Sequence, residues 1–350
     1  MKKKLLAVLL SAAMATALTA CGQTASEADN TAAQQSQEEP ATEDVAEESD
    51  VAGAEDETTY NVGIMQLVEH PALDLATDGF QDALKERLKD RVTFDYQNAQ
   101  GESANCASIA NVFVSANVDL IMANATPALQ SAAAATGTIP IVGTSITDYI
   151  TAGVVESNEA PGMNVTGASD LAPVDQQIAL LQRIVPDAKK VGIVYCSAEP
   201  NSAFQSELAT QYLTEAGIEV SEYTCADSNE VQAVVTKATA ECDCIYIPTD
   251  NTIANNMEIV KNITIPAGMP VICGEENMCA GGGLATLSIS YYDMGYAAGE
   301  MACEILLNGA DPATTPIRYV SDNIVAKYNA EAAEALGIEI PDDLVAIETE

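Results

Sequence analysis

The stretch that decides the fold is residues 61–96, which read NVGIMQLVEHPALDLATDGFQDALKERLKDRVTFDY. The apolar run at 61–67 predicts a buried strand, and 92–96 predicts a second one. Between them, apolar side chains recur every three to four positions over 75–89, which predicts a helix. A strand, a helix and a strand in this order are typical of a right-handed unit with parallel strands.

The same alternation runs through most of the chain. Further helices are predicted at 103–115, 127–136, 176–184, 201–216, 231–240 and 253–262. Further strands are predicted at 119–123, 140–143, 190–195, 219–223, 244–247 and 270–273. The two halves have similar layouts and meet near residues 164–173. We therefore expect an α/β fold of two doubly wound parallel-sheet lobes.

The last third of the chain is predicted to return to both lobes through a helix at 291–307 and a strand at 317–320. The chain would then cross between the lobes three times, forming a hinge around which they can move. The expected bounds are 60–170 plus about 289–318 for the first lobe, and 171–288 plus about 319–345 for the second.

Gly295 and Gly299 lie one turn apart in the predicted long helix. Small residues at this spacing let another helix approach closely. A membrane dimer motif is a poor fit, because Asp293 and Glu300 interrupt the apolar run. The pair therefore predicts close packing within the folded body.

The charge balance excludes several classes of partner. The 350 residues hold 14 Lys and Arg against 52 Asp and Glu, a net charge of −38. Nucleic acids and anionic lipid surfaces are bound through basic patches, so neither is expected as the main partner. A small ligand stays compatible, because net charge does not describe a single pocket.

The N-terminus predicts export and anchoring. Lys2 to Lys4 precede an apolar, Ala-rich core, and Leu18-Thr19-Ala20-Cys21 follows. This pattern resembles a bacterial lipoprotein signal, with residues 1–20 removed and the Cys21 thiol acylated. The alternative is an ordinary cleaved signal with an accidental cysteine. No other stretch reaches 18 apolar residues.

Residues 21–59 are expected to form a disordered tether behind the lipid. Positions 22–59 hold 12 acidic residues and no Lys or Arg, a composition that buries little apolar surface. Beyond the tether, the remaining body keeps 11 basic and 40 acidic residues, so it is acidic by itself.

Eight cysteines remain besides Cys21, and an exported chain permits disulfides. The spacing of Cys and His does not match a zinc site, so we expect no metal. Small buried thiols are the favoured interpretation, and a bridge between Cys273 and Cys279 stays open.

In parallel α/β sheets, ligands bind beyond the carboxyl ends of the strands. The loops at these ends are rich in Ser, Thr, Asn, Asp and Glu, and several begin helices, whose free N–H groups bind carboxylates. Such loops suit a zwitterion, with hydroxyls and helix N-termini for its carboxylate and an acidic side chain for its ammonium.

Acidic candidates for the ammonium come first. Asp250 is the leading one, and the alternative is that it caps the following helix. Under the ligand interpretation, Thr249 or Asn251 would take the cap. Asp148 is either a second acceptor or a turn residue. Glu275 follows a strand, and a solvated loop acid is the favoured interpretation for it.

Hydroxyl and amide candidates follow the other strands. Thr126 precedes a proline at a helix start, where its hydroxyl either caps or contacts the ligand. Ser145 and Thr147 offer further hydroxyls. Asn201 and Ser202 begin a helix of the second lobe, and helix capping explains them nearly as well.

The first loop of the cleft holds His70, the single histidine of the chain. We expect hydrogen bonding or ring stacking on a ligand from it, rather than catalysis. Glu69 is interpreted as a turn or lobe-closure residue. Val68, Leu73 and Tyr292 are predicted apolar walls, with core packing as the alternative.

Seven stretches together resemble one family. They are Gly63-Ile-Met-Gln-Leu-Val-Glu-His-Pro-Ala-Leu-Asp74 with Gly79-Phe80, Asp95-Tyr-Gln-Asn-Ala-Gln-Gly101, Asp119-Leu-Ile-Met-Ala-Asn-Ala-Thr-Pro-Ala128, Asn164-Val-Thr-Gly167, Pro200-Asn-Ser202, Pro248-Thr-Asp-Asn251 and Tyr291-Tyr-Asp-Met-Gly295. The chain resembles bacterial ABC-transporter substrate-binding lipoproteins of the tryptophan or aromatic amino-acid type. One departure is the loop at 144–150, which lacks the Pro expected after Asp148.

The resemblance implies a type I periplasmic-binding fold, capture of an aromatic amino acid and delivery to an ABC permease. We also expect a monomer outside the cytoplasm, held to the bacterial cell membrane through Cys21, with no cofactor. Two alternatives share the fold: a ligand-sensing lipoprotein, and a binder of another solute such as a nucleoside, a sugar or a different amino acid. An exported enzyme is a third alternative. It is disfavoured because the chain has no nucleophile elbow, zincin motif or Rossmann glycine triplet.

Overall fold

The computed structural model describes residues 58–320 and 324–348. The expected leader at 1–20, the lipidation of Cys21 and the tether up to residue 57 lie outside the described residues. All the described residues belong to one compact unit. Within the described ranges, no helix is both long enough and apolar enough to cross a membrane.

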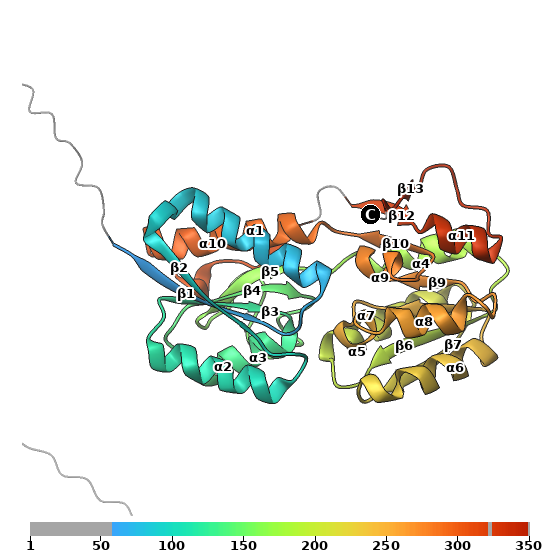
Figure 1. Ribbon diagram of the computed structural model, residues 1–350, viewed down its shortest axis with the longest axis horizontal. Coiled ribbons are helices and arrows are strands. Elements are labelled where there is room, and N and C mark those ends of the chain that lie inside the picture. Colours follow the sequence, from blue (N-terminus) through green and yellow to red (C-terminus); the bar gives the residue numbers. More distant parts are fainter. Residues whose placement is uncertain (1–57, 321–323, 349–350) are drawn as a thin grey trace, which may run out of the picture. The chain divides into compact units, whose positions relative to one another are not determined.

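The first sheet has six strands in the order β11-β5-β4-β3-β1-β2, and every pair is parallel. Its strands are β1 (Tyr60–Gln66), β2 (Val92–Asn98), β3 (Leu120–Asn124), β4 (Ile141–Ile146), β5 (Val165–Ser169) and β11 (Arg318–Tyr319). Its helices are α1 (Pro71–Leu88), α2 (Ser103–Ala116), α3 (Thr126–Ala135) and α10 (Tyr291–Asn308). Helices α1 and α10 cover one face, and α2 and α3 cover the other (Figure 1).

The second sheet has seven strands in the order β13-β12-β10-β9-β8-β6-β7. Its strands are β6 (Lys190–Cys196), β7 (Glu219–Cys225), β8 (Cys244–Ile247), β9 (Val271–Cys273), β10 (Ala285–Ser288), β12 (Val325–Tyr328) and β13 (Val345–Ala346). Its helices are α4 (Val174–Ile184), α5 (Pro200–Glu215), α6 (Val231–Glu241), α7 (Asn251–Ala254), α8 (Met257–Thr264), α9 (Glu276–Ala280) and α11 (Ala330–Leu336). Short 3-10 turns lie at η1 (Lys89–Arg91), η2 (Ser228–Glu230) and η3 (Pro312–Thr314).

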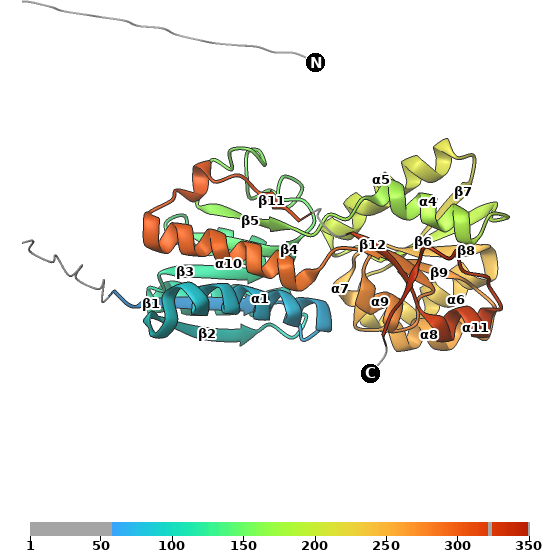
Figure 2. The ribbon, with the colours of Figure 1, turned by 90° about the horizontal axis from the view of Figure 1, so that it is seen from above.

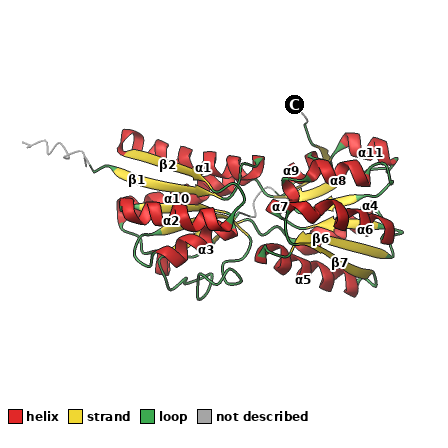
Figure 3. Ribbon diagram, turned by 60° about the horizontal axis from the view of Figure 1, so that its bottom comes forward, coloured by secondary structure: helices red, strands yellow, loops and turns green. Residues whose placement is uncertain are grey.

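Helices cover both faces of this second sheet as well (Figure 3). Side chains of α4, α5 and α11 pack on one face, and those of α6 to α9 pack on the other. The chain passes between the sheets after β5, after β10 and after β11. The predicted class, two parallel-sheet α/β lobes, is confirmed.

The elements α9, β10, β12, α11 and β13 were not predicted from the sequence, and three further differences concern predicted parts of the chain or the sheet pairing. Strand β5 (Val165–Ser169) lies where a junction was expected. It was not predicted, because its small residues lack an apolar pattern. The helix expected at 253–262 is two helices, α7 and α8, separated at Asn255 and Asn256. Strands β10 and β12 pair antiparallel, so the second sheet is mixed at this edge.

The close helix packing predicted from Gly295 and Gly299 is confirmed. Helices α1 and α10 run side by side (Figure 2). A Cβ atom at Gly295 would overlap the carbonyl oxygen of Ala76, and one at Gly299 would lie 2.7 Å from both the Cβ of Ala83 and the carbonyl oxygen of Phe80. The two backbones therefore touch with no space for a side chain.

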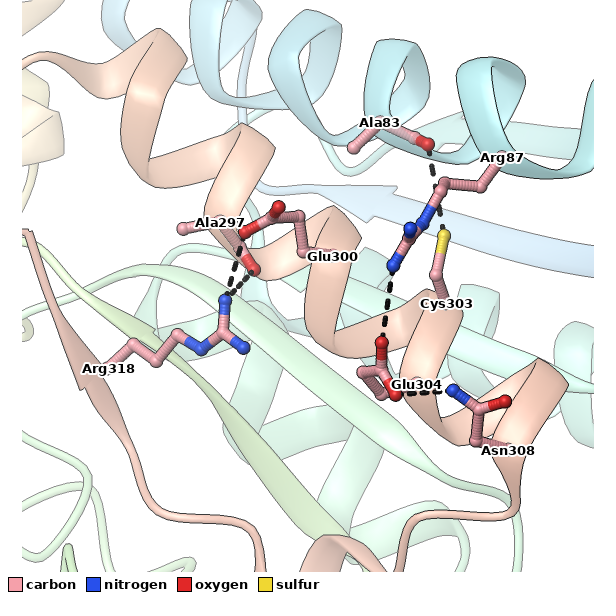
Figure 4. A network of polar contacts seen from close by, with 8 residues as sticks. All are labelled: Ala83, Arg87, Ala297, Glu300, Cys303, Glu304, Asn308 and Arg318. Carbon is pink, nitrogen blue, oxygen red and sulfur yellow. Dashed lines mark hydrogen bonds and ion pairs between the residues drawn. The ribbon is translucent and has the colours of Figure 1, made fainter.

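Charged side chains tie α10 to its neighbours on the exposed side (Figure 4). Arg87 of α1 pairs with Glu304 at 3.2 Å, and Arg318 of β11 pairs with Glu300 at 3.1 Å. The Cys303 thiol donates to the carbonyl oxygen of Ala83 at 3.8 Å. All these ion pairs are exposed, so their contribution to stability is small beside that of the packed backbones.

The eight cysteines beyond Cys21 are free thiols, and seven of them are buried. The bridge left open between Cys273 and Cys279 is therefore not formed. Among the described residues, no cluster of His, Cys, Asp and Glu is arranged to hold a metal ion.

Candidate functional site

A cleft between the two lobes collects most of the predicted site residues. Its lining lies at the carboxyl ends of β1, β4 and β5 in the first sheet, and of β6, β8, β9 and β10 in the second. The lining residues are His70, Ala72, Leu73, Ser145, Asp170, Asn201, Thr249, Asp250, Asn251, Ala254, Glu275, Met278 and Tyr291. This is the edge of the sheets at which parallel α/β folds bind ligands.

Asp170 sits directly after β5 and is 3% exposed. Its two carboxylate oxygens accept hydrogen bonds from the hydroxyls of Thr147 at 2.9 Å and Tyr291 at 3.2 Å. Burial raises the pKa of Asp170 to about 6, although the two hydroxyl donors partly oppose the increase. Because all of its donors are neutral, this carboxylate lacks a cationic partner.

Asp250 is the N-cap of α7, so its contacts in the structure are those of the capping alternative. Its oxygens accept from the backbone N–H of Ile253 at 2.7 Å and of Cys196 at 2.6 Å. The expectation that Thr249 or Asn251 would take the cap is wrong, because Asp250 occupies it. Burial, followed by the nearby Glu199, raises the pKa of Asp250 well above its usual range.

Glu275 is a buried cap rather than a solvated loop acid. It is 2% exposed and accepts from the backbone N–H groups of Asn277 and Met278 at the start of α9. Burial raises the pKa of Glu275 to about 7 despite these donors. Together with Asp170 and Asp250, it gives the cleft three buried acids, and its lining contains no Lys or Arg.

Two side chains of the lining have polar atoms without a partner. Ser145 Oγ and Asn201 Oδ1 are buried, and neither takes part in a hydrogen bond. Ser145 also has a φ of 56°, at a register shift between β4 and β5. A non-glycine residue in this region is strained, and such strain concentrates at functional sites. Both atoms are therefore free to contact a ligand.

The amide of Asn201 has one firm contact inside the second lobe. Its Nδ2 donates to the carbonyl oxygen of Thr249 at 3.0 Å, which the Ser202 hydroxyl also contacts at 3.2 Å. At the start of α7, Glu199 accepts from the N–H and side chain of Asn251. Asn251 therefore lines the cleft but uses its amide elsewhere.

His70 is the N-cap of α1. Its Nδ1 accepts from the N–H of Ala72 at 3.3 Å. Burial lowers the pKa of His70 to about 4, although Asp74 opposes the decrease. The ring is therefore neutral near pH 7, which suits a wall of the cleft better than proton transfer.

Seven predicted residues do not line the cleft, and one of them is Val68, which packs against the core of the first lobe as its alternative anticipated. Thr126 is the buried first residue of α3. Thr147 does not reach the cleft itself, but its hydroxyl donates to Asp170, which does. The side chain of Asp148 accepts from the N–H of Thr151 at 2.6 Å, as the turn alternative anticipated. The remaining three are the buried Ser202 and two residues outside the lining, Glu69 and Tyr292.

Tyr292 is 37% exposed, and its hydroxyl donates to Asp82 at 3.2 Å on the outer surface. The preceding residue, Tyr291, points into the cleft and is 5% exposed. One residue turns a helix by about 100°, so the two tyrosines face different directions. The tyrosine that lines the cleft is therefore Tyr291, and the prediction of Tyr292 as a wall residue is wrong.

Sequence reasoning missed Asp170, Tyr291 and Met278. Asp170 would have followed from the rule on strand ends, had β5 been recognised. Tyr291 could be identified only by knowing which face of α10 packs against the body. Met278 lies on α9, a helix that was not predicted.

The cavity enclosed by the lining has a volume of about 10 Å³. This is roughly the space that one water molecule needs. An amino acid therefore enters only when the lobes separate or the lining side chains move.

Comparison with known proteins gives consistent results. Residues 61–350 match the family described as ABC transporter substrate binding protein. The tyrosine-binding protein of Clostridioides difficile (strain R20291) is 38% identical over 282 residues, which are 80% of this chain and 81% of that protein.

Two solved structures are also similar. An ABC domain from Streptococcus pneumonia in complex with L-Trp has a TM-score of 0.80 and 35% identity, over 83% of this chain and all of that one. The ligand-free, open structure of a substrate binding protein with adhesive properties from Clostridium difficile has a TM-score of 0.66 and 37% identity, with the same coverage.

Proposed function

The chain belongs to the family of ABC transporter substrate-binding proteins, and we propose that its cleft captures an aromatic amino acid. Relatives named for binding tyrosine, or solved with L-Trp, support this ligand class. The observation that carries the proposal is the set of three buried acids without a basic neighbour in the lining, beside the unpartnered atoms of Ser145 and Asn201.

In this proposal, the ammonium group of the ligand contacts Asp170. This acid is the one whose donors are side-chain hydroxyls, whereas Asp250 and Glu275 use both oxygens on backbone N–H groups. A cation beside Asp170 offsets the cost of burying its charge. The unpartnered Ser145 hydroxyl donates to the ligand carboxylate.

The apolar part of the ligand contacts Leu73, Met278 and the neutral ring of His70. Methionine sulfur and aromatic edges pack favourably on a second ring. Asp250, Glu275 and Asn201 fix the opposite wall of the cleft through their backbone contacts. Thr147 acts on the ligand indirectly, because its hydroxyl donates to Asp170 and holds that carboxylate in place.

Anchoring and delivery complete the proposal. The protein acts outside the cytoplasm, and the lipid on Cys21 would hold it at the membrane while the tether spans the distance to a permease. Residues 22–57 form a chain long enough to reach well beyond the headgroups even when coiled.

The first test is a thermal-shift screen on a fragment that begins at Thr58, after mild unfolding to remove co-purified ligand. Tyrosine, tryptophan and phenylalanine are expected to raise the melting temperature by several degrees. A ligand at about 100 times its dissociation constant adds about 2.7 kcal/mol. Shifts with nucleosides or sugars alone would overturn the aromatic ligand, and leucine is the matched apolar control.

Affinity for the amino acid is expected to rise with pH between about pH 5 and pH 7.5. The ammonium pairs with ionised Asp170, whose pKa burial raises to about 6, so at lower pH a proton must first be removed. Each pH unit below that value costs about tenfold in affinity, or 1.36 kcal/mol. Isothermal titration in buffers of different ionisation enthalpy measures both the affinity and the released proton. A flat profile would contradict the ammonium contact.

A further inference from the structure

Two cysteines lie side by side at the carboxyl edge of the second sheet. Cys196 ends β6, Cys225 ends β7, and the two residues are direct partners in the parallel register. Neighbouring strands are about 4.7–4.9 Å apart, which falls within the range of about 4.4–6.8 Å between α-carbons that a disulfide spans. The backbone therefore already holds the pair at bridging distance.

The two side chains lie on the same face of the sheet, because they are register partners and pack in one apolar cluster. Each thiol has a backbone acceptor as well: Cys196 Sγ lies 3.6 Å from the carbonyl oxygen of Ala226, and Cys225 Sγ lies 3.7 Å from that of Tyr195. Closing a bond between the sulfurs requires local side-chain adjustment and no rearrangement of the sheet.

The two thiols differ in their access to a cavity. Cys196 is 2% exposed and lines a cavity of about 370 Å³ between the lobes, which meets the cleft lining at Asn251. Cys225 is fully buried behind it. Cys196 is therefore the attacking thiol and Cys225 the resolving one.

The surroundings of Cys196 favour its thiolate. The adjacent Cys225 thiol lowers the pKa of Cys196, while burial and the nearby Glu199 oppose the decrease. A thiolate with a pKa near or below the ambient pH is the nucleophile in thiol–disulfide exchange. The neighbouring Cys196 sulfur raises the pKa of Cys225, so this residue stays a thiol until the charge on Cys196 is gone.

We propose that Cys196 and Cys225 form a thiol–disulfide exchange site that accepts a low-molecular-weight disulfide through this cavity. The Cys196 thiolate attacks one sulfur of the small disulfide and expels one small thiolate. The Cys225 sulfur then attacks the Cys196 sulfur and expels the second small molecule as a thiolate, and the Cys225 proton goes to one of the two small thiolates. The protein pair is oxidised by two electrons, and the small disulfide is reduced to a thiol and a thiolate, which takes from water the proton that Cys196 released when it ionised.

The test is a peptide map of the full chain after treatment of the native protein with excess oxidised glutathione. The reaction is quenched with acid, and the chain is unfolded, alkylated with N-ethylmaleimide and digested with trypsin. Residues 191–237 form one tryptic peptide that contains only Cys196 and Cys225. We expect this peptide to lose both labels and to be two hydrogen atoms lighter.

A matched control is present in the same digest. Residues 238–261 form the adjacent peptide, which contains Cys242 and Cys244. Cys244 is buried and Cys242 is partly exposed, and burial raises the pKa of each, so neither favours the thiolate and the control peptide is expected to keep both labels. Two labels on the 191–237 peptide, or equal oxidation of both peptides, would overturn the proposal.

A variant separates the two steps. In Cys225→Ser the resolving thiol is absent, so Cys196 is expected to keep one glutathione in mixed disulfide. In Cys196→Ser the buried Cys225 is expected to carry no adduct. An adduct on Cys225 in Cys196→Ser, or none on Cys196 in Cys225→Ser, would refute the assigned order. None of these measurements uses the amino acid, so the outcome is independent of the proposed ligand.

Discussion

Asp170→Asn is expected to weaken binding of the aromatic amino acid by about 30- to 4000-fold. Removing one partner of a buried, hydrogen-bonded charge pair costs about 2–5 kcal/mol, and 1.4 kcal/mol is a factor of ten. The amide keeps the size of the carboxylate and retains an acceptor for Thr147 Oγ1, so the cleft stays in shape. The loss is therefore in the charge that faces the ammonium, and isothermal titration measures it.

The fold of this variant is expected to be unharmed. In the absence of ligand, Asp170 is a buried acid whose neighbours are neutral, and its raised pKa indicates that ionisation is unfavourable there. A neutral amide removes that cost, so the melting temperature without ligand should be unchanged or higher. The matched control is Asp187→Asn at an exposed position, which should bind normally. Full affinity in Asp170→Asn would remove Asp170 from the site.

The fold was largely predictable because its signal is periodic. Buried parallel strands such as β6 and β8 are continuous apolar runs, and the amphipathic helices between them repeat every three to four residues. Strand β5 broke this pattern, since Val-Thr-Gly-Ala-Ser has a single large apolar side chain. It belongs to the sheet because it pairs with β4 and β11. A short stretch of sequence does not reveal pairing with strands elsewhere in the chain.

The site was predictable in location but less so in its individual roles. The rule on strand ends led to Ser145, Asp250 and Glu275, and all three line the cleft. It could not separate ligand contacts from helix caps, because an acid that precedes a helix suits both. Only the three-dimensional contacts indicate that Asp250 and Glu275 spend their oxygens on backbone N–H groups while Asp170 does not.

Gly295→Ala is expected to destabilise the first lobe by about 3 kcal/mol. Two effects compete at this site. Alanine in a helix interior is favoured over glycine by about 1 kcal/mol. Against this, the added Cβ overlaps the carbonyl oxygen of Ala76 and lies 2.7 Å from its carbonyl carbon and Cα. These are backbone atoms of α1, so they cannot rotate away as a side chain would.

Relief therefore requires α1 and α10 to separate along their whole contact, which also opens the layer of Phe80, Met294 and Ala298 beneath them. Overpacking of this kind costs about 1–3 kcal/mol when side chains can yield, and more when they cannot. Urea unfolding measures the difference. Gly137→Ala is the matched control, because a Cβ there meets nothing within 4 Å, and it should change stability by less than about 0.5 kcal/mol. Equal stability of both variants would mean that the helix contact tolerates a side chain, and the backbone approach would then not be the reason for glycine at position 295.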